Sequence, residues 1–88
     1  MDAESVVEGY RCIFMRMAND GQVDVAIRLA NAALKLAERS TGQTSAVTGR
    51  VLLDLLDLYD ISGQEEEAKR VWGRIAQVIK ALDSADAC

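Results

Sequence analysis

The chain has 88 residues, half of them hydrophobic, and its 14 acidic and 10 basic side chains give a formal net charge of −4. This length limits it to a single domain, residues 1–88, and the hydrophobic content is too high for a disordered chain. The acidic balance argues against nucleic acid, which needs a basic surface. The sequence has no His. It therefore lacks the residue that most often acts as a general base, activates Ser and Cys nucleophiles, and binds metals through its imidazole. We therefore expect a binding protein, not an enzyme, with no cofactor and no metal.

The cysteines and the N-terminus predict a cytoplasmic protein. Small secreted domains usually carry several closely spaced Cys, whereas this chain has only Cys12 and Cys88. Two free thiols in a reducing compartment are expected; a Cys12–Cys88 bridge or an intermolecular Cys88 bridge is the alternative. The acidic start, residues 1–4, leads into no long apolar run, so no signal peptide is expected. No segment has the roughly 20 apolar residues that span a bilayer.

The first half of the chain has the 3.6-residue period of two helices. The first is predicted from Asp2 to Ala18, with Ser5 and Glu8 as a capping box near its start. A turn at 19–21, ending on Gly21, leads to the second, Gln22–Ser40. Polar residues of the second helix follow one narrow stripe: Asp24, Arg28, Asn31, Lys35 and Glu38. The other sides are apolar, which predicts a helix buried on most sides.

The second half predicts two more helices. The third begins at Thr44 or Ser45, both favourable N-caps, and reaches Ile61, with a polar edge at Arg50, Asp54, Asp57 and Asp60. A turn and capping box at 62–65 precedes the fourth, which is expected to end near Leu82, leaving 83–88 frayed. No segment alternates like a strand. The fold class is therefore all-α, with four helices as two stacked antiparallel hairpins and the second and third helices inside.

The two halves match each other at an offset of 42 residues, which places Gly21 on Gly63 and Ala26 on Ala68. Further positions follow in the same register. Ala30 and Ala33 fall on Trp72 and Ile75, and Tyr10, Ile13, Phe14 and Met17 fall on Leu52, Leu55, Leu56 and Tyr59. The sequence thus repeats one helix-pair unit, at about 7–42 and 49–82.

The repeat resembles the tetratricopeptide repeat, in the long form found in kinesin light chains. That family's pattern is matched by Leu52, Leu55, Tyr59, Gly63, Ala68 and Trp72 in the second unit, and by Tyr10, Ile13, Met17, Gly21, Ala26 and Ala30 in the first. Phe14 and Leu56 stand where the family has a small residue. The resemblance implies a superhelix of paired helices that acts as a protein–protein interaction scaffold or adaptor.

In this family the first helix of each pair lines a concave groove that holds a partner. The resemblance carries that role to eight principal positions here: Glu8, Arg11, Met15, Asn19, Arg50, Leu53, Asp54 and Asp57. Cys12 and Asp60 adjoin them. The acidic side chains of the third helix favour a protein or peptide partner with basic residues. The alternative is that these side chains are ordinary solvated positions.

The fourth helix carries an apolar arc of about 120°, wider than the roughly 100° that packing on one side requires. Stacks of two units usually need further repeats or a polar cap for stability. We therefore expect self-association into a homodimer or larger homo-oligomer that buries Val71, Trp72, Ile75, Val78 and Ile79. The alternative is a plain four-helix bundle that serves as a structural or regulatory subunit without a groove.

Overall fold

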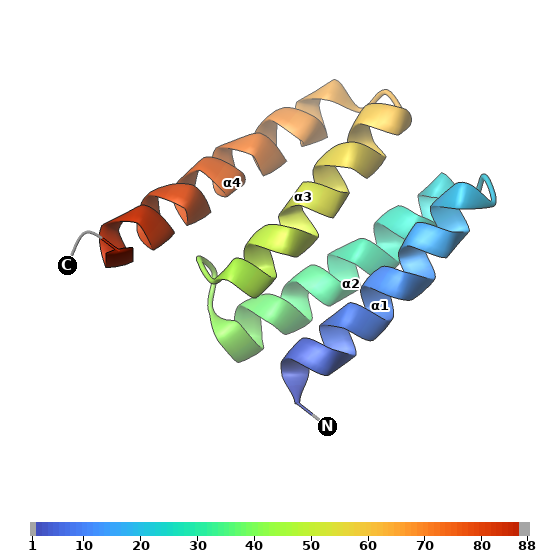
Figure 1. The fold of residues 1–88 in the computed structure, drawn as a ribbon. Helices are drawn as coiled ribbons and strands as arrows, with labels where there is room; N and C mark the ends of the chain where they lie inside the picture. The colour runs from blue at the N-terminus through green and yellow to red at the C-terminus, as the bar shows by residue number, and fades with distance from the viewer. Residues whose placement is uncertain (1, 87–88) are drawn as a thin grey trace.

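The computed structural model describes residues 2–86, which form four helices joined by short turns (Figure 1). Their bounds are α1 Ala3–Asn19, α2 Val23–Thr41, α3 Ala46–Ile61 and α4 Glu65–Asp86. No strand occurs within this described part of the chain. The all-α prediction is confirmed, and seven of the eight predicted helix ends lie within two residues of the observed ones.

The exception is the end of α4, which continues through Asp86, four residues beyond the predicted end at Leu82. No Gly or Pro interrupts this stretch, and Ala85 has the highest intrinsic helix propensity, so nothing local stops the helix after Leu82. Residues 87 and 88 lie outside the described part of the chain. The proposed bridges of Cys88 fall there too, while Cys12 is an exposed free thiol on α1.

Side-chain caps and glycine turns fix where the helices begin and end. The cap of α1 is Asp2, whose carboxylate accepts a 2.7 Å hydrogen bond from the Ser5 backbone N–H, so the predicted Ser5–Glu8 box is wrong. Asp2 is extended and aims its carboxylate at that N–H, whereas Ser5 already lies inside the helix. Ser45 caps α3 as predicted. Gly21 and Gly63 take φ of 86° and 75° in the turns, a conformation that favours Gly.

The four helices form a flat stack, not a closed bundle. Neighbours in sequence pack together, and α1 also meets α3, but no Cα atom of α1 lies within 8 Å of one in α4 among the described residues. The Cα trace measures 44 × 34 × 17 Å along its principal axes. Figure 1 shows the hairpins α1–α2 and α3–α4 side by side, with α2 and α3 inside. The predicted hairpin arrangement and inner pair are confirmed.

The core is built from small residues on α2 and large ones on its neighbours. Ala26, Ala30, Ala33 and Ala37 of α2 are all fully buried, which lets α1 and α3 approach closely. Phe14 of α1 is also fully buried, whereas Leu56 of α3 is half-buried. The large Phe14 is accommodated because α2 has alanines along the core.

Candidate interaction surfaces

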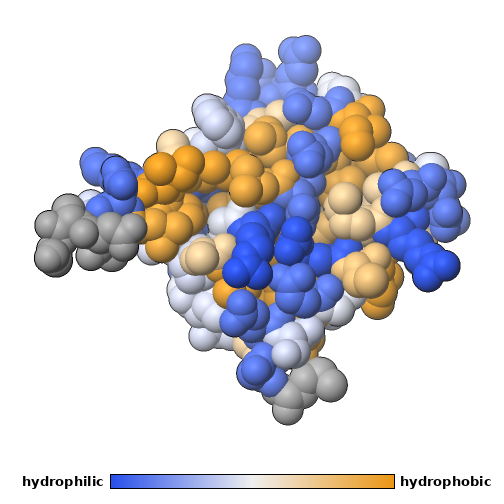
Figure 2. Space-filling view, in the orientation of Figure 1, coloured by the Kyte–Doolittle hydropathy of each residue, from blue (hydrophilic) through white to orange (hydrophobic). Residues whose placement is uncertain are grey.

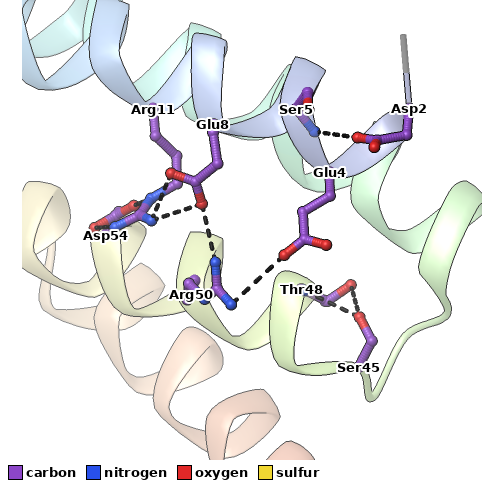
Figure 3. Close-up of polar contacts among 9 residues, drawn as sticks. All are labelled: Asp2, Glu4, Ser5, Glu8, Arg11, Ser45, Thr48, Arg50 and Asp54. Atoms are coloured by element: carbon purple, nitrogen blue, oxygen red, sulfur yellow. Dashed lines mark hydrogen bonds and ion pairs between the residues drawn. The ribbon is translucent and has the colours of Figure 1, made fainter.

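Charged side chains of α1 and α3 form a ladder across the junction of the two hairpins (Figure 3). Arg11 of α1 makes two hydrogen bonds to the Asp54 carboxylate of α3, from Nε to Oδ2 and from Nη2 to Oδ1. The Arg11 Nη1 also lies 3.1 Å from Glu8 Oε1, and this same oxygen lies 3.0 Å from Nη1 of Arg50. Arg50 in turn reaches Glu4 at 3.7 Å. The five side chains alternate in charge and fix the first helix of one hairpin against the first helix of the next.

Asp54 is the buried end of this ladder. Its side chain is only 11% exposed, so its placement on the open polar edge of the third helix is wrong. Sequence reasoning missed this because the polar residues at 50, 54 and 57 share one helical face, and periodicity does not reveal that α1 covers part of it. The acidic edge that was expected to meet a basic partner is reduced to the exposed Asp57 and Asp60.

The ladder shifts the pKa values of two of its members. Hydrogen bonds from the Arg11 guanidinium are the main reason that the pKa of Glu8 lies below its ordinary value. Burial opposes this shift, and the charge of Arg11 and the contacts with Arg50 add to it. The Asp54 carboxylate, which accepts hydrogen bonds from Arg11, raises the pKa of that guanidinium above its ordinary value. Both shifts favour the charged forms of Glu8 and Arg11, as expected for ion-paired side chains.

A lowered carboxyl pKa links stability to pH. The native state holds Glu8 ionised more strongly than the unfolded chain does, so its contribution is present above the ordinary glutamate pKa and is lost as the pH falls through the lowered value. We therefore expect the free energy of unfolding of wild type to fall more steeply in acid than that of Glu8→Gln. Urea unfolding at a series of acid pH values measures this difference. Parallel curves for the two proteins would contradict it.

The residues predicted to line one groove lie in two different places. Glu8, Arg11, Cys12, Met15 and Asn19 line a shallow hollow of about 450 Å³ along α1, with Arg16 beside them. Arg50 and Asp54 join this group only through the charge ladder, whereas Leu53 faces a separate groove between α3 and α4. The structure thus brings together the α1 positions but does not unite them with Leu53 and Asp57 in one groove.

The groove between α3 and α4 is lined mainly by apolar side chains. It has a volume of about 340 Å³, and its lining residues are Ala46, Gly49, Arg50, Leu53, Trp72, Ile75, Val78, Ile79 and Leu82. Trp72 and Ile79 are 56% and 57% exposed, and Leu53 is 49% exposed. Figure 2 shows this region as a continuous apolar band over α3 and α4, next to the charged patch at the α1–α3 junction.

Only part of the predicted self-association surface on α4 is free. Val71, Ile75 and Val78 are at most 7% exposed and belong to the core. The assignment of Val71 to an intermolecular contact is therefore wrong, while Ile75 and Val78 reach the surface only at the bottom of the groove. These side chains lie along the side of α4 that packs on α3. The close approach there is set by Gly49, where an added Cβ would lie 3.0 Å from Val78 Cγ1. Trp72 and Ile79 lie on the adjacent strip, with Leu82 and the previously unassigned Ala46 and Gly49 completing the groove.

Among residues 2–86 no three Cys, Asp or Glu side chains are placed to hold a metal ion. None of the described helices is both long and apolar enough to cross a membrane. No known family model, no curated protein and no solved structure matches this chain.

Proposed function

We propose that this chain is a protein–protein interaction module of the tetratricopeptide-repeat type that self-associates through the groove between α3 and α4. The charge ladder supports the repeat. Glu8 and Arg50, which pair at 3.0 Å, are 42 residues apart and so occupy the same position in the two units. The helix contacts, with α3 lying against both helices of the first hairpin, are those of one pair stacked on the next.

The observation that carries the proposal is the exposed apolar groove at the end of the stack. A half-exposed Trp beside an exposed Ile and Leu is costly to leave in water, and Trp is enriched among the residues that dominate binding at interfaces. The groove walls are two packed helices, so the site exists before a partner arrives. A preformed apolar groove favours the docking of a further helix.

The test is the oligomeric state of wild type and Trp72→Glu. We expect sedimentation velocity over the micromolar range to give wild type a mass above that of one chain. Trp72→Glu should return the protein to a monomer, because the new charge would have to be desolvated in the contact. Trp72 is the only Trp of the chain, so its fluorescence should also shift to the blue as wild type is concentrated.

Gln77→Glu is the matched control, because it adds the same charge to an exposed position of α4 that does not line the groove. It should associate as wild type does. A wild-type protein that stays monomeric throughout, or a Trp72→Glu variant that associates normally, would refute the proposal. The latter result would also be the one expected of a structural subunit that uses no groove.

A further inference from the structure

The groove between α3 and α4 is the repeat equivalent of the surface on which α3 sits. Shifting by 42 residues places Ala30, Ala33 and Ala37 of α2 on Trp72, Ile75 and Ile79. The three alanines are fully buried in the stack, whereas Trp72 and Ile79 are open to water. On the first helix of the pair, Glu8 and Arg11, which contact α3, correspond to Arg50 and Leu53 of the groove. Within the chain, the surface formed by one helix pair is therefore covered by the first helix of the next unit.

The helix equivalent to α3 is α1, and its matching face is uncovered. Val47, Val51 and Leu55 of α3 are at most 9% exposed, and they correspond to Ser5, Gly9 and Ile13. Those three residues, with Val6 and Tyr10, line an open hollow of about 290 Å³. Ile13 is 52% exposed. One end of the stack thus has an uncovered groove between α3 and α4. The other end has α1, the equivalent of the helix that covers the corresponding surface inside the chain.

The two ends are complementary in size. Inside the chain, the small Ala30 and Ala37 of α2 belong to one core with the larger Val51 and Leu55 of α3. At the free ends the sizes are exchanged along the first half of α1, because α4 presents Ile79 while α1 presents Ser5 and Gly9. A Cβ added at Gly9 would meet no atom within 4 Å, so the hollow has room for a large side chain.

Helices α2 and α3 run antiparallel, with Asn31 hydrogen-bonded to Tyr59. The same register brings Ile79 opposite Gly9 and Trp72 near Met17. A branched side chain opposite a glycine reproduces the tight packing that protein interiors require.

The charges agree as well. In the repeat register, Glu8 of a second molecule would stand where Arg50 stands inside the chain, and it would face Arg50 of the first molecule, which takes the place of Glu8. Opposite charges would meet again. Cys12, the equivalent of Asp54, would meet Leu53, the equivalent of Arg11, which replaces a buried ion pair by an apolar contact.

We infer that α1 of a second molecule docks in the α3–α4 groove of the first, with Ile79 facing the hollow at Gly9. This inference rests on the proposed self-association and specifies its geometry. The two surfaces in contact are different, so the interface is head-to-tail and the assembly continues into a ring or a filament. The charge ladder of α1 and α3 would continue from one molecule to the next.

The test uses two variants that each remove one surface. Trp72→Glu places a charge in the α3–α4 groove, and Ile13→Glu places one on the α1 face. Both residues are exposed in the single chain, so both variants should keep the helical circular dichroism of wild type. Each is expected to sediment as a monomer, while wild type forms species larger than a dimer. An equimolar mixture should give a 1:1 heterodimer and nothing larger, because it holds one intact groove and one intact α1 face.

A second α1 variant guards against misfolding of the first. Gly9→Lys places a side chain in open space and improves helix propensity, so it should fold at least as well as wild type and fail to self-associate. If Ile13→Glu and Gly9→Lys associate like wild type while Trp72→Glu is monomeric, the groove pairs with another groove; the head-to-tail inference is then wrong and the proposed self-association stands. If wild type itself is monomeric, both the head-to-tail inference and the proposed self-association are wrong.

Discussion

Phe14→Ala is expected to destabilise the fold by about 3–5 kcal/mol, the usual cost of removing a buried aromatic ring from a core. Phe14 is fully buried and lies in one core cluster with the alanines of α2. Alanines have no side-chain atoms that can move into the space of a missing ring, so the cavity would persist. A domain of this size has a total stability of about 4–13 kcal/mol. The variant should therefore be partly or fully unfolded at room temperature.

Urea unfolding followed by circular dichroism measures this loss. Met15→Ala is the control, because Met15 is the next residue of the same helix but is 39% exposed, and its truncation should cost less than about 1 kcal/mol. Equal losses for the two variants would mean that α1 does not pack on α2 through Phe14. The comparison therefore tests the orientation of α1 within the first hairpin.

Arg11→Ala is expected to cost about 2 kcal/mol, more than its partly exposed position suggests. The Asp54 carboxylate is 11% exposed and receives two hydrogen bonds from Arg11. Removing the guanidinium leaves that carboxylate buried without a counter-charge, which is more costly than losing a surface ion pair. The midpoint of urea unfolding at neutral pH gives the measurement.

Arg50→Ala provides the matched comparison within the same ladder. Arg50 and its partner Glu8 are 46% and 45% exposed, so their ion pair is screened by water and its loss should cost less than about 1 kcal/mol. The double replacement Arg11→Ala with Asp54→Ala should recover part of the loss, because it removes the buried charge together with its partner. An Arg11→Ala variant no less stable than Arg50→Ala would show that Asp54 is hydrated in the native protein.

The sequence by itself determined the helices, the turns and the repeat. Local chemistry sets these features, because a capping Ser45 or a turn glycine at positive φ acts within a few residues of its own position. The stripe of polar residues on the second helix also predicted that α2 lies inside the stack. The 42-residue repeat predicted two hairpins, and the helix contacts agree.

Only the tertiary structure decided which way each apolar or charged face points. The apolar arc of α4 was visible in the sequence, but its width did not reveal that Val71, Ile75 and Val78 pack on α3 while Trp72 and Ile79 stay exposed. The burial of Asp54 depends on an arginine 43 residues away, brought close by the register of the stack. Periodicity measures how wide a face is, whereas its direction depends on neighbouring helices that the local sequence does not contain.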